Sequence, residues 1–228
     1  FLKFYINKII KVSLFNYING LVSPILISYI NVNLNFSISK MSFVGIFNIS
    51  RYFSVLTTFL PNSYIQKVMP EYMRANKETS NFKRKLLNKY LNQIILMTIS
   101  FWLLLILLRP VFFEIYMFSG EGSFIYNFVI SIAAITIITS IPGFHLNSLF
   151  RYKILLIVNI LVLVLIFIIF QVEVIDLKIK FFLYLLVTFL LNLFLIIYNY
   201  SDYGKSILIK TFCSSIIIVL YNLLFIYL

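Results

Sequence analysis

The sequence predicts an all-α fold, a polytopic bundle of about six or seven membrane-spanning helices. Hydrophobic residues make up 62% of the 228 residues and charged residues 11%, whereas soluble domains are roughly 45–50% apolar and about 25% charged. The apolar residues form long runs without two-residue alternation, which favours helices over the strands of a barrel. No stretch is polar enough to form a soluble domain, so residues 1–228 are predicted to form a single membrane domain.

Seven apolar runs are long enough to cross a bilayer, because about 20 helical residues cover its ~30 Å hydrocarbon core. The first run follows a lysine-rich start and contains Pro24, and the second contains Pro61 and is predicted to end at Pro70. The fourth is predicted to end at Pro142-Gly143, because proline removes a helix hydrogen bond. The other runs follow short charged loops. The predicted spans are 12–30, 43–68, 91–108, 124–141, 154–170, 181–198 and 207–227.

Basic residues are distributed unevenly between the two sides of the predicted bundle. Fourteen lysines and arginines fall on the side of the N-terminus, and four fall on the opposite side. Because segments rich in Lys and Arg stay in the cytoplasm, the N-terminus and the loop 69–90 are predicted to be cytoplasmic, and the odd number of spans places Leu228 outside. The net charge of +12 is therefore interpreted as a topology signal, and nucleic acid is not an expected partner.

The loop 69–90 is predicted to contain a basic helix capped by Thr79, Ser80 or Asn81. Its lysines and arginines either face solvent as topology determinants or contact anionic lipid headgroups. Membrane lipids are therefore an expected partner of the chain.

Arg51 is the most informative polar residue, because it lies inside the second predicted span. A charge in hydrocarbon costs at least ~2.5–3.5 kcal/mol, so a retained one usually faces a cavity, a partner or a ligand. No carboxylate lies in any predicted span, so a substrate anion is the expected ionic partner. The planar guanidinium suits a phosphate, which indicates a carrier for an acidic substrate. The alternative is a structural arginine that extends its charged group toward the membrane surface.

Four further polar residues in or near the first two spans are candidate substrate-binding residues. Lys40 lies near the outer end of the hairpin and is interpreted either as a second cation for an anion or as an interfacial anchor. Three asparagines either line a polar cavity or form interhelical hydrogen bonds worth about 0.6 kcal/mol each. They are Asn16 and Asn19 in the first span and Asn48 in the second.

Two prolines are candidate hinges, because a proline inside a helix frees a backbone carbonyl and favours a kink. They are Pro24 in the first predicted span and Pro61 in the second. His145, the single histidine, follows the predicted break at Pro142-Gly143 and is interpreted as a loop residue rather than a proton relay.

The sequence offers little for catalysis or metal binding. One histidine and one cysteine, Cys213, cannot build a metal cluster or an internal disulfide. There is no phosphate-binding GxxxxGK[ST] loop, no GxSxG motif and no pair of carboxylates in a span. Glu173 and Asp176 are explained as solvated loop charges. A transporter without a cofactor or metal is therefore expected rather than an enzyme.

Several motifs resemble those of Wzx-type polysaccharide flippases, which belong to the multidrug/oligosaccharidyl-lipid/polysaccharide exporter superfamily. They are VGIFNISRYFS at 44–54, Phe59-Leu60-Pro61, Val68-Met69-Pro70-Glu71 before the basic loop, and RPVFFEIYMFSGEGSF at 109–124. The last of these resembles the family's approach to the next helix. The resemblance covers residues 16–147, and beyond it only the hydropathy is similar.

The resemblance implies an alternating-access transporter with two six-helix lobes around a central cavity. This chain would be the second, C-terminal lobe, although it has seven predicted spans, and the first lobe is expected upstream. Arg51 would be the cavity arginine of the lobe's second helix. The implied substrate is an undecaprenyl-diphosphate-linked oligosaccharide, flipped across the bacterial cytoplasmic (inner) membrane for surface polysaccharide biosynthesis. Other polysaccharide-assembly membrane proteins are implied partners.

The sequence leaves three alternative functions open. A cation-coupled multidrug extruder of the same fold would need acidic residues in its cavity, and the spans contain none. A membrane polymerase or glycosyltransferase would need a substantial outer loop or a catalytic acidic motif, and the loops here are short. A non-catalytic membrane subunit is the third alternative.

Overall fold

The structure, a computed structural model, describes residues 2–36, 41–74, 80–117, 122–138, 152–198 and 205–227. Within these ranges the regular structure is entirely helical, as predicted. Each described helix contains most or all of one predicted span. The helices are α1 (Leu2–Phe36), α2 (Met41–Arg74), α3 (Ser80–Ile115), α4 (Ser123–Ile138), α6 (Tyr152–Gln171), α7 (Leu177–Tyr198) and α9 (Lys205–Tyr227).

Six of these helices are long and apolar enough to cross a membrane: α1, α2, α3, α6, α7 and α9. The remaining one, α4, has 16 described residues, which correspond to about 24 Å of helix. The end of its predicted span, the Pro142-Gly143 break and His145 lie outside the described residues. The chain is therefore a multi-pass membrane protein with a bundle of six or seven spans.

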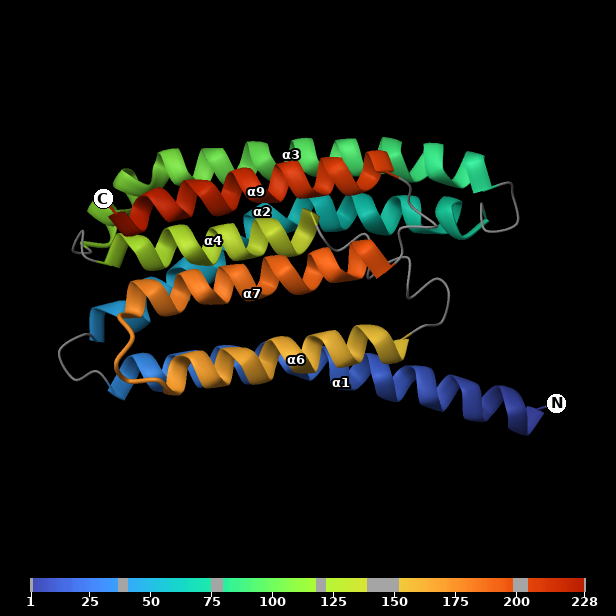
Figure 1. Cartoon of the computed structure of the whole chain (residues 1–228), viewed down its shortest axis with the longest axis horizontal. Helices are drawn as coiled ribbons and strands as arrows, with labels where there is room; N and C mark the ends of the chain where they lie inside the picture. Colours follow the sequence, from blue (N-terminus) through green and yellow to red (C-terminus); the bar gives the residue numbers. More distant parts are fainter. Residues whose placement is uncertain are drawn as a thin grey trace.

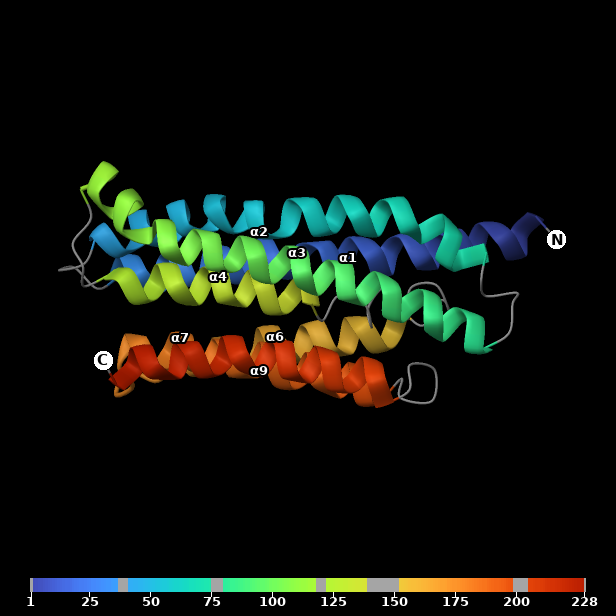
Figure 2. The ribbon, with the colours of Figure 1, turned by 90° about the horizontal axis from the view of Figure 1, so that it is seen from above.

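The central helix of the bundle is α4. Thirteen of its sixteen residues are buried, and it packs against α2, α3, α7 and α9. A helix that is apolar on all sides is typical of such a central position. Figure 1 shows the helices side by side along the long axis, with α1 and α6 together at one edge, and Figure 2 shows the same bundle from above.

Aromatic contacts fill the core between α2, α4, α6 and α7. Phe181 on α7 is fully buried, and its ring centroid lies 6.4 Å from Phe128, 6.1 Å from Phe47 and 5.6 Å from Phe170. Lipid chains are as apolar as these side chains, so the helices associate through close van der Waals packing rather than through the hydrophobic effect. This packing fixes the positions of α2, α4 and α7 relative to one another.

Two helices continue past a proline that lies just after a predicted span. The predicted end of the second span at Pro70 is wrong, because α2 continues to Arg74. Tyr72 is fully buried in a cluster with Leu87 and Leu91 of α3. We attribute the continuation to this packing, which offsets the helix-interior penalty of a proline, about 3 kcal/mol.

The helix that contains the third predicted span also extends beyond it, because α3 passes through Pro110 and ends at Ile115. Beyond the proline, the ring of Phe112 stacks on Phe53 of α2 with a centroid distance of 4.0 Å. The first part of the segment 109–124 therefore belongs to the end of α3 rather than to the start of the next helix.

The first helix extends beyond its predicted span at both ends. Its 35 residues, Leu2–Phe36, include the lysine-rich segment that was expected to precede the span. At 1.5 Å per residue this helix is about 52 Å long. Pro24 in α1 and Pro61 in α2 both lie inside helices that are assigned without interruption.

Candidate functional site

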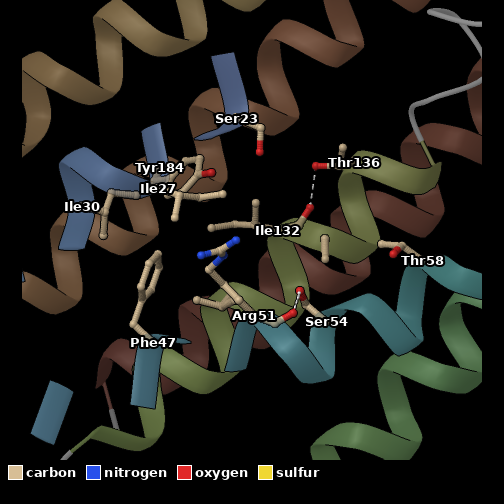
Figure 3. A pocket seen from close by; sticks show the side chains of 12 residues that line it. Ser23, Ile27, Ile30, Phe47, Arg51, Ser54, Thr58, Ile132, Thr136 and Tyr184 are labelled. Atoms are coloured by element: carbon tan, nitrogen blue, oxygen red, sulfur yellow. Dashed lines mark hydrogen bonds between the residues drawn. The ribbon is translucent and has the colours of Figure 1, made fainter. Parts of the chain in front are cut away.

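A pocket with a volume of about 240 Å³ lies between α1, α2, α4 and α7. It is lined by Ser23, Ile27 and Ile30 of α1, Phe47, Arg51, Ser54 and Thr58 of α2, Val129, Ile132, Ala133 and Thr136 of α4, and Tyr184 of α7. Figure 3 shows the Arg51 side chain pointing into this space from α2, with Ser23 and Tyr184 on the other side. The pocket therefore combines an apolar wall with one cation and several hydroxyl groups.

The α2 side of the pocket follows from the helical repeat. Phe47, Arg51, Ser54 and Thr58 are spaced by four, three and four residues, which places them on one face of an α-helix. The opposite face of α2 carries exposed apolar residues, Leu56 and Leu60. The same helix thus presents an apolar face outward and a face with Arg51 toward α1, α4 and α7.

Arg51 is partly buried. Among the residues that the structure describes, no carboxylate pairs with its guanidinium and no hydrogen bond to it is found. The hydroxyl group of Tyr184, which is not ionised, is close enough for an electrostatic interaction with the Arg51 guanidinium. The guanidinium therefore retains hydrogen-bond donors that can bind an anion in the pocket.

The hydroxyl groups around Arg51 divide into two kinds. Ser54 Oγ donates to the carbonyl of Arg51 at 2.7 Å, and Thr58 Oγ1 donates to the carbonyl of Val55 at 3.0 Å. Since their protons are used within α2, these two oxygens can only accept from a ligand. Ser23 and Tyr184 have no such bond among the described residues and can donate. The hydroxyl groups of Ser23 on α1 and Tyr184 on α7 therefore add hydrogen-bond donors to those of Arg51 on α2.

Asn48 lies one turn before Arg51 but is not among the residues that line the pocket. Its side-chain amide exchanges two hydrogen bonds with Asn31 of α1, at 3.2 and 3.3 Å. This is the interhelical role that the sequence left open as an alternative to substrate binding. Asn16 and Asn19 belong to α1, but their side chains lie outside the described part, and Lys40 lies outside the described residues altogether.

A second arginine, Arg109, provides a contrast with Arg51. It directly follows the third predicted span, 91–108, and lies inside α3, about two turns before the end of that helix. Its guanidinium carbon lies 5.1 Å from the ring centroid of Phe225 on α9, a cation–π contact. One of its terminal nitrogens is buried without a hydrogen-bond partner in the described part of the chain. It does not line the Arg51 pocket.

The candidate hinge prolines lie near the pocket but not in it. Pro61 is buried on α2, one turn beyond Thr58, and Pro24 follows Ser23 on α1 and is exposed. Each proline therefore lies within one turn of a residue that lines the pocket.

Sequence reasoning missed the hydroxyl groups of the pocket. Ser54 and Thr58 share the face of Arg51, so the spacing in the sequence was a sufficient signal for them. Ser23, Thr136 and Tyr184 lie on three other helices. Only the way these helices pack brings the three side chains to Arg51, and an isolated sequence carries no signal for that packing.

Comparison with protein-family models, with curated proteins and with solved structures gives no match. The resemblance to polysaccharide flippases therefore stays a prediction, and the pocket is the structural feature that bears on function.

Proposed function

We propose that this chain is part of a flippase that translocates a polyprenyl-diphosphate-linked oligosaccharide across a bacterial cytoplasmic membrane. The observation that carries the proposal is Arg51, a cation in a membrane pocket without an anionic partner among the described residues. An arginine inside a membrane span is costly unless a ligand, a cavity or a counter-ion compensates for it. An anionic substrate is the compensation that fits a carrier.

The chemistry of the pocket favours a phosphate over a cationic or neutral ligand. The Arg51 guanidinium, with Tyr184 and Ser23 nearby, supplies donors for phosphate oxygens. A cationic drug would need a carboxylate, and no carboxylate is among the residues that line the pocket. A drug extruder of the same fold therefore fits the pocket less well than a flippase does.

The size of the pocket indicates which part of the substrate it holds. Its volume of about 240 Å³ is below the roughly 300–1,000 Å³ of sites that enclose a drug-sized ligand. It matches an anionic headgroup rather than a whole oligosaccharide. In this proposal Arg51 binds the diphosphate, the sugars occupy a wider aqueous path, and the polyprenyl chain stays in the bilayer.

Translocation requires that Arg51 be reached from each membrane surface in turn. Carriers of this kind rock one helix bundle against another around a site near the midplane. Pro24 and Pro61, each next to the pocket, are the proposed hinges. The basic end of the bundle, where α3 begins, faces the cytoplasm in this proposal, because Lys and Arg are retained on that side.

The test is transport of a polyprenyl-diphosphate-linked oligosaccharide by the full-length protein in proteoliposomes, with lectin access to the sugar as the readout. We compare the wild type with Arg51→Lys and Arg51→Gln at equal protein levels. Loss of a charged hydrogen bond is worth about 1.5–3 kcal/mol, so we expect Arg51→Gln to transport about tenfold to a hundredfold more slowly. Arg51→Lys keeps the charge and is expected to retain partial activity.

Arg109→Gln is the matched control, because it removes a membrane arginine that does not line the pocket. We expect this variant to transport at close to the wild-type rate. Equal rates for all Arg51 variants would show that Arg51 does not handle the substrate. A wild-type protein that moves no substrate would contradict the flippase proposal itself.

A further inference from the structure

Lys210 of α9 connects two helices at the end of the bundle where α3 and α9 begin. Its ammonium group donates to the side-chain oxygens of Asn88 and Asn92 on α3, at 2.9 and 3.0 Å. An ammonium group carries three donors, and the described residues supply no third acceptor. Because both amides present their oxygens to Lys210, their NH₂ groups point away from the ammonium and stay available as donors.

Two more lysines share this face of α3. Lys85, Asn88, Lys89 and Asn92 fall within about 100° of the helix circumference, at 100° per residue. Lys85, Lys89 and Asn92 are exposed, whereas the buried residues of this part of α3, such as Leu87 and Leu91, lie on a different face. The α3 face that receives Lys210 thus gathers three cations and two amides.

No protein anion neutralises this cluster in the described part of the chain. The single described carboxylate near the start of α3 is Glu71 of α2, which accepts a hydrogen bond from the hydroxyl of Tyr90. Like charges at positions i and i+4, such as Lys85 and Lys89, destabilise a helix slightly unless an anion lies between them. Lys85, Lys89 and Lys210 therefore have hydrogen-bond donors for an anion, but no described carboxylate occupies that position.

We propose that Lys85, Lys89 and Lys210 form a binding site for the phosphate of an anionic phospholipid headgroup. Lys210 lies within the first turns of the apolar helix α9, whose candidate span starts at Lys205. That level corresponds to the boundary between the hydrocarbon core and the headgroups. A phosphodiester there accepts from the third donor of Lys210, from the amide of Asn92 and from the two exposed lysines.

This site is independent of the Arg51 pocket, since no residue of the cluster lines that pocket. It would hold a structural or regulatory lipid rather than the transported substrate. The lipid would join the ends of α3 and α9, which already contact each other.

The test measures the melting temperature of the full-length protein in detergent during titration with phosphatidylglycerol or phosphatidylcholine. We expect phosphatidylglycerol to raise the melting temperature more than phosphatidylcholine does. In the double variant K85Q/K89Q this difference is expected to be largely lost. Each lysine near the surface contributes about fivefold to binding, so the apparent affinity should fall about 25-fold.

The matched control is K67Q/K205Q, which removes two exposed lysines from the same end of the bundle but from other helix faces. It is expected to keep most of the response to phosphatidylglycerol. K85Q and K89Q change exposed side chains, so the fold should tolerate them. Lys210→Arg keeps the charge and is expected to bind the lipid, whereas Lys210→Gln is expected to lose both the lipid response and the bond between helices.

Three results would overturn the proposal. One is an equal rise in the melting temperature of the wild type with both lipids. Another is an equal loss of the phosphatidylglycerol response in K85Q/K89Q and in the control K67Q/K205Q. The third is a response to inorganic phosphate alone that matches the response to phosphatidylglycerol, because it would identify a free anion rather than a lipid as the ligand.

Discussion

At the scale of single residues, two polar side chains one turn apart on α4 have opposite surroundings. Both amide atoms of Asn127 are buried without a hydrogen-bond partner in the described part of the chain. Ser131 Oγ, by contrast, accepts from Trp102 Nε1 at 3.0 Å and from Asn222 Nδ2 at 2.8 Å. A buried polar group without a partner costs about 1–3 kcal/mol, whereas a bonded one stabilises the fold.

These surroundings predict stability changes of opposite sign. Asn127→Leu replaces the unpaired amide with an apolar group of similar branching, so we expect the free energy of unfolding to rise by about 1–3 kcal/mol. Ser131→Ala leaves the buried indole N–H of Trp102 unpaired, so we expect a decrease of about 1–3 kcal/mol. Unfolding in mixed micelles with SDS measures both, with the fluorescence of Trp102, the single tryptophan, as the signal. A destabilised Asn127→Leu would show that this amide has a partner.

At the scale of the helices, the Asn31–Asn48 pair is a specific bond between α1 and α2. Interhelical hydrogen bonds in membranes average about 0.6 kcal/mol and reach about 1.7 kcal/mol. A double-mutant cycle with Asn31→Ala, Asn48→Ala and the double variant should therefore give a coupling energy of about 0.6–1.7 kcal/mol. Additive single effects would contradict a direct bond. The pair lies one turn from Arg51, so we expect it to fix the approach of α1 to the pocket.

The positions of the helices could be predicted from the sequence, but several of their ends could not. A run of about 20 apolar residues is sufficient evidence for a membrane helix, and this identified all seven described elements. The ends after Pro70 and Pro110 were missed because burial of Tyr72 and stacking of Phe112 depend on neighbouring helices. Arg51 could be singled out from the sequence because a charged side chain inside an apolar span has a high energetic cost. Tyr184 was not, because a tyrosine in an apolar run has no such cost.

At the scale of the whole molecule, the short helix α4 decides on which side of the membrane each loop lies. Between Lys85 on α3 and Val174 after α6, the chain passes along α3, α4 and α6. If all three cross the membrane, Lys85 and Val174 lie on opposite sides. If α4 does not cross, they lie on the same side. The number of crossings between these two positions is therefore a direct test of the bundle's topology.

We expect α4 to cross, because its sixteen described residues are almost all buried at the centre of a bundle of longer spans. In a Cys213→Ser background, which removes the single and exposed cysteine, a membrane-impermeant maleimide applied to intact cells should label Val174→Cys and leave Lys85→Cys unlabelled. A permeant maleimide should label both, which controls for reactivity, since both side chains are exposed. Labelling of Lys85→Cys alone would reverse the orientation expected from the positive charges. Equal labelling of both variants would contradict seven crossings, because it requires that one helix between the two positions fail to span the membrane.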